Sequence, residues 1–193
     1  MGEVRMSLME SGDIPGAAAV LARAMVDNPL HRAVFGDPAP ARQKQIQSMF
    51  LELFNNLPAT TLIARDGENL VGVMRMKPCT GPETGDAPSG EEPKTDQEYR
   101  QRIWFREWDL RDPDEPHWHL GPIGVLPTHR RRGIGAMLME VFCREVDRTG
   151  VMAYLETDLD DNVRFYRKFG FDVVDTSDIF GVENRYMVRP RLV

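Results

Sequence analysis

Apolar residues recur at helical spacing in two stretches near the start of the chain. Residues 14–25 carry one such stripe, and Asp13 and Pro15 supply a capping signal and a first-turn signal for it. Residues 42–53 carry a second stripe, after a segment at 28–40 that contains Pro and Gly and is predicted to be a loop. Both stretches are predicted to be amphipathic helices.

Two strand-like segments follow these helices. Residues 60–65 and 69–76 are rich in apolar and β-branched residues, and Asp66-Gly67 between them is a strong signal for a hairpin turn. The pattern therefore predicts an antiparallel pair of strands.

The second half of the chain alternates between short apolar segments and amphipathic ones. The predicted strands are residues 117–126, 152–157, 171–174 and 184–188. The predicted helices run from residue 132 or 133 to 147 and over residues 161–169, where Gly170 ends the second one. This order of elements, without an internal repeat, predicts a single α/β domain over residues 1–193.

Residues 78–116 interrupt this order with a segment rich in Pro, Gly, Glu and Asp. Within it, residues 97–108 keep a helical period through Tyr99, Ile103 and Trp104, so we predict a loop, a helix and another loop. The segment is either a mobile lid or pocket wall, or a surface insertion that the fold tolerates. Glu107 and Asp109 in it are candidates for lining a pocket for a cationic amine, or for a solvated helix end.

Composition and charge narrow the class of partner. The chain has 193 residues, of which 41% are hydrophobic and 28% charged, as in globular proteins. A formal net charge of -6 argues against a nucleic-acid partner, because such proteins carry a positive excess. Charges interrupt every apolar stretch before it reaches the ~18 residues of a membrane span, so we expect no membrane association and a cytoplasmic location. Cys79 and Cys143 lack metal-like or redox-like spacing, so no metal site is predicted.

A turn rich in arginine and glycine joins a predicted strand to a predicted helix at residues 130–136. Glycines at 133 and 135 let the backbone approach a diphosphate closely, and the first N–H groups of the helix point at it. The alternative is an ordinary glycine turn beside a solvated basic cluster. The turn lacks the Gly-Lys-Ser/Thr of a P-loop, and Leu138 stands where a dinucleotide fingerprint has its third glycine.

Two motifs in this region resemble one family. The pattern Arg130-x-x-Gly133-x-Gly135, after the strand at 120–125, resembles the acetyl-coenzyme A signature of the GCN5-related N-acetyltransferases (GNAT family). Residues 162–171 resemble the later helix-to-strand segment of that family. The amino-acid sequences at 117–120 and 155–157 are most similar to its puromycin-acetyltransferase-like branch. The resemblance implies an α/β fold with a splayed, mixed, mainly antiparallel central sheet flanked by helices.

The resemblance also implies that acetyl-coenzyme A is the acyl donor. The two central strands would separate after Val125, so that the backbone of residues 123–125 pairs with the pantetheine arm, and the turn would hold the diphosphate. The residues implied to contact the coenzyme are Ile123, Gly124, Val125, Arg130, Arg131, Arg132, Gly133, Ile134, Gly135, Ala136, Asn162 and Tyr166.

In this family an amine attacks the thioester directly. A backbone N–H near Val125 would stabilise the oxyanion, and Tyr166 stands where members donate a proton to the leaving thiolate. A phenol suits that step because its pKa lies close to that of a thiol. The alternative for Tyr166 is packing against the coenzyme alone.

Two residues are candidates for the general base. Glu156 lies near the end of a strand, where some relatives place their base, and a cleft raises the pKa of a carboxylate. His119 lies near the start of the preceding strand, and imidazole works at pH 7 with little tuning. Strand alternation is expected to put His117 and His119 on one face with Ile123 and Val125. Each candidate has a purely structural alternative: Glu156 as a hydrogen-bonding partner, and His119 as a histidine whose hydrogen bonds are satisfied within the strand. Of the two candidates for the base, Glu156 is favoured slightly.

The acceptor is expected to be a primary amine on a small molecule. The alternatives are a protein or peptide acceptor, which needs an open groove, and a non-catalytic sensor that only binds an acyl-coenzyme A. A homodimer is possible, because dimers are common among proteins of this type.

Overall fold

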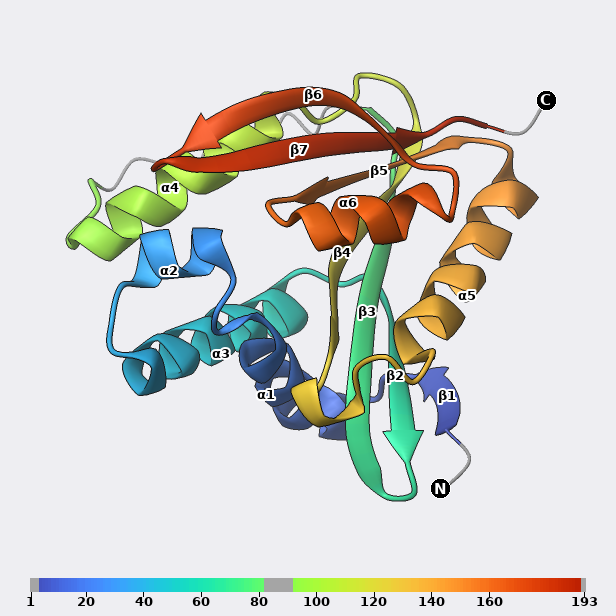
Figure 1. The fold of residues 1–193 in the computed structure, drawn as a ribbon, viewed down its shortest axis with the longest axis horizontal. Helices are drawn as coiled ribbons and strands as arrows, with labels where there is room; N and C mark the ends of the chain where they lie inside the picture. Colours follow the sequence, from blue (N-terminus) through green and yellow to red (C-terminus); the bar gives the residue numbers. More distant parts are fainter. Residues whose placement is uncertain (1–3, 82–91, 192–193) are drawn as a thin grey trace.

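The computed structural model describes residues 4–81 and 92–191. Within them, seven strands form one mixed sheet in the order β1-β2-β3-β4-β5-β7-β6 (Figure 1). The strands are β1 (Val4–Leu8), β2 (Thr60–Asp66), β3 (Asn69–Cys79), β4 (His117–Val125), β5 (Met152–Thr157), β6 (Asp172–Ile179) and β7 (Val182–Arg189). Every neighbouring pair is antiparallel except β4 and β5, which are parallel. The predicted fold class is therefore confirmed.

Helices cover both faces of this sheet. They are α1 (Ile14–Met25), α2 (Pro29–Phe35), α3 (Ala39–Asn56), α4 (Asp96–Asp109), α5 (Ile134–Thr149) and α6 (Asp160–Arg167), with short 3-10 turns at Ser11–Asp13 and Pro127–His129. One apolar core joins α5 and α6 to the sheet, and a second joins α1, α2, α3 and Trp104 of α4 to the other face. Figure 1 shows α5 and the group α1 to α3 on opposite sides of β3 and β4.

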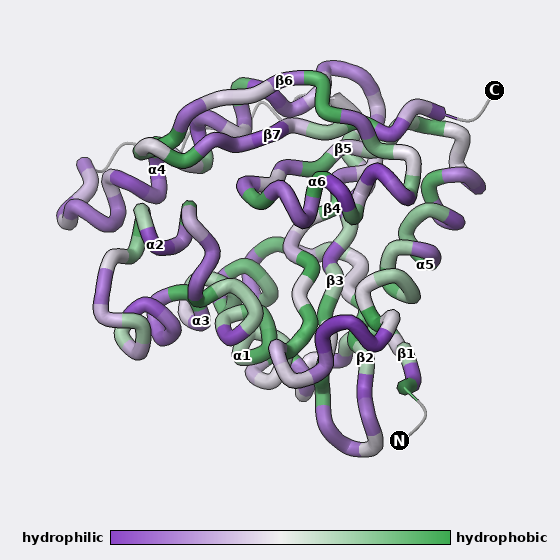
Figure 2. Tube along the Cα trace, viewed as in Figure 1, coloured by the Kyte–Doolittle hydropathy of each residue, from purple (hydrophilic) through white to green (hydrophobic). Residues whose placement is uncertain are grey.

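The hydropathy of the chain follows these layers. Apolar residues concentrate along α1, α5 and the middle strands, whereas the β2–β3 turn and the segment leading into α5 are hydrophilic (Figure 2). The hydrophilic segment before α5 is the arginine-rich turn, which lies at the surface.

Two elements were not predicted. The segment at 28–40, predicted to be a loop, contains α2, whose first turn is capped by the Asn28 side chain accepting from the His31 N–H at 3.0 Å, with Pro29 at the first helical position. The strand β1 at the edge of the sheet was missed because it is short and half exposed. The predicted strand at 171–174 is the start of the longer β6.

A bulge in β4 changes which side chains share a face. Met74 pairs with Ile123 and Met76 with Leu120, so two residues of β4, Gly121 and a proline, lie opposite one residue of β3. Ile123 therefore points to the same face as Leu120.

This register contradicts the predicted grouping of side chains. Ile123 and Val125 pack against the core on the α5 face, together with Leu120. His119 precedes Leu120 in a regular part of the strand, so its side chain points to the opposite face of the sheet. The prediction that His117 and His119 share a face with Ile123 and Val125 is wrong, because the extra residue of the bulge shifts the alternation by one position.

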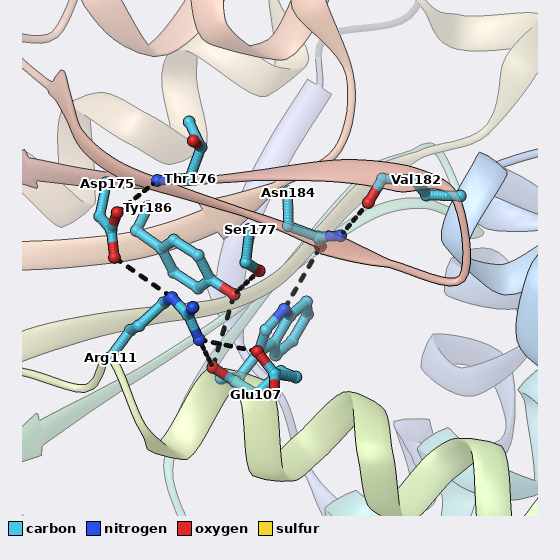
Figure 3. A network of polar contacts seen from close by, with 9 residues as sticks. Glu107, Arg111, Asp175, Thr176, Ser177, Val182, Asn184 and Tyr186 are labelled. Atoms are coloured by element: carbon cyan, nitrogen blue, oxygen red, sulfur yellow. Dashed lines mark hydrogen bonds and ion pairs between the residues drawn. The ribbon is translucent and has the colours of Figure 1, made fainter.

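A polar network fixes the end of α4 against β6 and β7 (Figure 3). Arg111, just after α4, contacts Asp175 at 3.2 Å and Glu107 at 2.8 Å, and its guanidinium lies 5.0 Å from the ring centre of Tyr186. The Tyr186 hydroxyl and the Ser177 hydroxyl are 2.7 Å apart. These contacts hold the aromatic face of α4 in place beside the sheet.

No helix in the part of the chain that the structure describes is long and apolar enough to cross a membrane.

Candidate active site

The parallel strands β4 and β5 separate soon after they begin. They pair only where His117 to His119 face Met152 to Tyr154, and the rest of β4 pairs with β3 alone among the described residues. The Leu126 N–H donates to the Val71 carbonyl at 2.9 Å, and successive N–H groups of a strand point to opposite edges. The N–H groups of Val125 and Ile123 therefore face the open edge between β4 and β5.

The turn before α5 leads from this edge into the start of the helix. Its backbone is left-handed at Arg131 (φ 60°) and Gly133 (φ 81°), and glycine adopts that conformation without strain. No side chain caps α5, and its first turn contains no acidic residue. The N–H groups of Ile134, Gly135 and Ala136 have no partner within the helix, because the Met137 N–H makes the first intrahelical bond to the Gly133 carbonyl. This arrangement fits an anionic group such as a diphosphate.

Two of the three arginines of the turn already have protein partners. The Arg130 guanidinium donates to the Ala24 carbonyl at 2.7 Å, and Arg132 lies 3.3 Å from the Asp66 carboxylate. Both contacts tie the turn to its neighbours, α1 and the β2–β3 hairpin. Arg131 is exposed and has no such contact among the described residues, which leaves it as the arginine of the turn with a side chain available for a ligand.

The two candidate bases meet across the point where β4 and β5 separate. The His119 Nε2–H donates to Glu156 Oε2 at 2.9 Å. The Glu156 side chain is 4% exposed and that of His119 is 28% exposed. Burial lowers the pKa of His119, but the Glu156 carboxylate outweighs burial, so the pKa lies above its ordinary value. The two side chains therefore form one unit.

His117 serves a different purpose from His119. Its Nδ1 lies 2.8 Å from the Glu115 carbonyl, and its Nε2 lies 3.3 Å from the Asp112 carboxylate. Burial lowers its pKa, but the contact with Asp112, supported by those with Cys79 and the Glu115 carbonyl, outweighs burial and raises the pKa to about 10. His117 joins the loop after α4 to the start of β4.

Tyr166 and Asn162 come from α6, on the far side of the gap between the strands. Tyr166 is 6% exposed, and burial, with the charges of Glu156 and Asp158 adding to it, raises the pKa of its phenol. The Asn162 amide donates to the Thr157 hydroxyl at 3.0 Å, so it fixes the start of α6 to the end of β5.

One cavity of about 250 Å³ brings these side chains together. Its polar wall includes His119, Glu156, Asn162 and Tyr166. Its apolar wall comes from α1, α2, α3 and α4 and includes Met25, Leu30, Met49, Phe50, Leu53, Trp104, Phe105 and Trp108. That volume is on the order of twenty times what one buried water needs.

The helix α4 contributes aromatic side chains to this wall, as one of the two interpretations of residues 78–116 expects. Of the two interpretations of its acidic residues, the one that places them in a pocket for a cationic amine is wrong, and exposed Asp109 agrees with a solvated helix end. Glu107 pairs with Arg111, Asp109 is exposed, and neither lines the cavity. Residues 82–91 lie outside the described part of the chain.

Sequence reasoning missed a group of side chains between α1, α2 and β5. The Asp158 carboxylate accepts from the Asn28 amide at 2.6 Å and from the Leu30 N–H at 2.9 Å. Asn28, Asp158 and His31 all line the cavity. The capping signal Asn28-Pro29 was available in the sequence, but its contact with Asp158, 130 residues away, was not.

In residues 4–81 and 92–191, no group of three or more His, Cys, Asp or Glu side chains is placed to hold a metal ion.

A family comparison agrees with this geometry. The model of the acetyltransferase (GNAT) family matches residues 28–171, well over half of the chain. The chain belongs to the GNAT family of acetyltransferases. The expected family and enzyme class are thereby confirmed.

Solved structures of other acetyltransferases share the fold of this GNAT protein over nearly its whole length. A Corynebacterium glutamicum protein described as histone acetyltransferase HPA2 and related acetyltransferase has a TM-score of 0.71 at 20% identity, over 100% of this chain and 98% of the other. An agmatine N-acetyltransferase variant has a TM-score of 0.65 at 15% identity, over 96% and 98%. A GNAT acetyltransferase from Brucella melitensis, solved with acetyl-coenzyme A, has a TM-score of 0.57 at 16% identity, over 100% and 93%.

Proposed function

We propose that this acetyltransferase moves an acetyl group from acetyl-coenzyme A to the primary amine of a small molecule by direct attack. The observation that carries the proposal is one cavity that is lined by the His119–Glu156 pair, Tyr166 and the bulged part of β4. Base, acid and donor edge thus lie around one space, as a transfer without a covalent enzyme intermediate requires.

The donor would bind mainly through the backbone. The N–H groups of Ile123 and Val125 face the open edge of β4, where the pantetheine arm pairs as an added strand. The uncapped start of α5, with Gly133, Gly135 and Arg131, takes the diphosphate. Arg130 and Arg132 support this turn through their contacts with Ala24 and Asp66 and do not act as free counter-charges.

The His119–Glu156 pair supplies the base. Glu156 accepts the Nε2–H of His119, which orients the ring and leaves Nδ1 to accept the proton of the ammonium form of the substrate. The carboxylate then stabilises the imidazolium. The sequence slightly favoured Glu156 as the base. The contact between the two side chains supports the proposal that His119 takes the proton and Glu156 positions it.

The remaining steps concern the thioester. The Val125 N–H donates to the carbonyl oxygen as negative charge develops on it. Tyr166 donates its proton to the leaving thiolate, and its raised pKa keeps the phenol protonated until that step. Asn162 holds the first turn of α6 against β5 and so positions Tyr166 four residues later.

A small acceptor suits the shape of the cavity better than a peptide does. Aromatic side chains of α4 form part of its wall, and the Arg111 network fixes that helix to β6 and β7 (Figure 3). One of the similar structures is named an agmatine N-acetyltransferase, and agmatine is a small amine. The amino-acid sequence at 117–120 also predicts the puromycin-acetyltransferase-like branch. The second candidate is a protein acceptor, which the name of the Corynebacterium protein favours.

The test is release of free thiol from acetyl-coenzyme A by the purified protein. Aminonucleosides, polyamines, amino acids and short peptides are offered in turn, and Tyr166→Phe is assayed alongside. We expect turnover with a small amine and a loss of about 10²-fold or more in kcat in the variant, because general acid catalysis contributes on that order.

Tyr186→Phe is the matched control. Tyr186 is also a buried tyrosine, and it does not line the cavity. The substitution keeps the ring beneath Arg111 and removes only the hydroxyl contacts with Ser177 and the Glu107 carbonyl. We expect it to keep its activity. Turnover with peptides alone would move the assignment to a protein acceptor, and binding of acetyl-coenzyme A without turnover of any amine would favour a sensor.

A further inference from the structure

Asp158 is a charged residue of the cavity wall that has no cationic side chain paired with it. It follows directly after β5 and lines the cavity together with His119, Glu156 and Tyr166. The negative charge of Glu156 is paired with His119, whereas Asp158 forms no ion pair with any residue that the structure describes. A charge that is partly withdrawn from water without a counter-charge is unfavourable, so this position suits a ligand that brings one.

The cationic side chains nearby do not neutralise Asp158. Nη1 of Arg185 donates only to the main-chain carbonyl of Asp158, at 3.3 Å, while its Nη2 lies 2.7 Å from the Asp160 carboxylate. Among the described residues that line the cavity, Arg75 is the only arginine or lysine, and it forms no ion pair with Asp158. His31 also lines the cavity, but burial lowers its pKa to about 3, so the ring is neutral at pH 7.

The carboxylate of Asp158 lies among residues of the cavity wall. One oxygen accepts from the Asn28 amide at 2.6 Å and the other from the Leu30 N–H at 2.9 Å, and Asn28 and Leu30 both line the cavity. Both donors are neutral, so they supply hydrogen bonds without cancelling the charge. A carboxylate has about four lone-pair sites, and these two contacts leave others available. Asp158 is half-buried and lines the cavity, so a ligand there can reach it.

Asp158 also lies close to the reaction centre. Two peptide units join Glu156 to Asp158, so their Cα atoms are at most about 7 Å apart. The charges of both residues act on Tyr166, where they add to burial in raising the pKa of the phenol. Two amines joined by three to six carbons stand about 5–9 Å apart when the chain is extended. A cation at Asp158 is therefore within reach of a short chain from an amine at His119.

The wall around these polar groups is mainly apolar. It includes Met25, Leu30, Met49, Phe50 and Leu53. Methylene groups are buried favourably against such side chains, whereas a polar group in the middle of the chain would lose its hydration. The cavity of about 250 Å³ therefore suits a compact molecule with polar ends and an apolar middle.

We propose that Asp158 is a specificity-determining residue that binds the second ammonium group of a short aliphatic diamine. The inference rests on the proposed function and names the acceptor class within it. The amine that is acetylated lies at the His119–Glu156 pair, the methylene chain packs along the apolar wall, and the distal ammonium donates to the Asp158 carboxylate. The carboxylate for a cationic acceptor then comes from the end of β5 and not from α4, where the sequence suggested Glu107 and Asp109 as candidates.

The experiment compares each diamine with the monoamine in which a methyl group replaces the distal amine. The pairs are 1,3-diaminopropane with butylamine, 1,4-diaminobutane with pentylamine, 1,5-diaminopentane with hexylamine, and 1,6-diaminohexane with heptylamine. We expect kcat/KM for thiol release to favour the diamine of the best pair by about tenfold or more, because only the diamine forms a charge-assisted hydrogen bond to the carboxylate. The two identical amines of a diamine account for no more than a doubling.

Variants connect this preference to the charge of Asp158. Asp158→Asn keeps the size of the side chain and removes the charge, so we expect the ratio within the best pair to fall at least about fivefold. Asp160→Asn is the matched control, because the Asp160 side chain is 69% exposed, pairs with Arg185 and does not line the cavity. We expect it to keep the ratio of the parent protein. A ratio measured on one enzyme sample does not depend on the fraction folded.

A second variant separates the charge of Asp158 from its contact with α2. In Asn28→Ser the serine retains an oxygen that caps the helix but lacks the amide that donates to Asp158. We expect the diamine ratio to stay close to that of the parent, because the carboxylate is still present. A fall as large as that in Asp158→Asn would show that the preference comes from the contact with α2, and would overturn the inference.

The remaining outcomes separate this inference from the proposed function. Equal kcat/KM within every pair, apart from the doubling, would overturn the inference, and so would a preference for diamines that Asp158→Asn leaves unchanged. Turnover of aromatic amines or amino acids but of none of these pairs would overturn it and leave the proposed function in place. A failure to release thiol with any small amine would overturn both.

Discussion

Removal of the Glu156 carboxylate should move the pH profile of this acetyltransferase toward acid. His119 Nε2 lies 2.9 Å from Glu156 Oε2, and Glu156 is almost fully buried, so solvent screens the pair little. Burial lowers the pKa of His119 and the Glu156 charge raises it above its ordinary 6.5. In Glu156→Gln the side chain keeps its size, but the effect of burial remains without the largest effect that opposes it.

The size of the shift follows from the charges. Unit charges about 4 Å apart interact by roughly 4 kcal/mol at an effective dielectric constant near 20, which corresponds to about 3 pKa units. Opposite charges at such distances shift a pKa by about 1–3 units in proteins. The pKa of His119 should therefore fall in the variant, and a change of this general size can be measured in a pH–rate profile.

The sign of the effect on activity follows from the role of the base. Only unprotonated His119 accepts a proton, so activity develops as the pH rises through its pKa. The acid limb of kcat/KM should lie above pH 6.5 in the parent protein and at lower pH in Glu156→Gln. The ratio of variant to parent activity should thus be highest at the acid end of the profile.

The assay is thiol release under limiting acceptor, measured from about pH 5 to 9. Glu140→Gln, which changes an exposed carboxylate on α5, is the matched control and should leave the acid limb in place. An acid limb with the same pKa in Glu156→Gln and in the parent protein would refute the assignment of His119 as the base and Glu156 as the group that raises its pKa.

Two further predictions concern the donor turn and the start of β4. Gly135→Asp should weaken coenzyme binding by about 100-fold or more, as measured by calorimetry, since its carboxylate opposes the diphosphate. An added Cβ at this position would lie 3.5 Å from the Phe165 ring, an ordinary van der Waals contact, so the Cβ itself does not strain the fold. The raised pKa of His117, about 10, means that its stabilising contribution is complete below about pH 6.5 and is lost as the pH rises through 10. The midpoint of thermal unfolding should therefore fall over this range in the parent protein, and less so in Asp112→Asn.

Each of these predictions has its own control. Gly135→Ala adds the Cβ without the charge and should weaken coenzyme binding much less than Gly135→Asp does. Undiminished binding by Gly135→Asp would remove the diphosphate assignment. For His117, the exposed variant Asp114→Asn should unfold with the pH dependence of the parent. An equally steep dependence in Asp112→Asn would show that Asp112 does not hold the proton on His117.

The elements of the fold could largely be predicted from the sequence because their signals are local. The stripe at residues 14–25, the Asp66-Gly67 turn and the glycine turn before α5 each act within a few residues, and each lies where it was predicted. The two motifs that indicated the family are likewise short, local sequence signals. Helix α2 was missed because it has only seven residues, too few for a clear period.

The arrangement of the site depended on contacts that no local pattern contains. The bulge in β4 arises from its register against β3, and it decides that His119 and Ile123 face opposite sides of the sheet. The contact between His119 and Glu156 joins residues 37 positions apart, and that between Asn28 and Asp158 joins residues 130 apart. The sequence by itself determined which elements form and which chemical groups are present. The tertiary structure decided which groups meet, because strand register and packing set distances, burial and therefore pKa and tautomer.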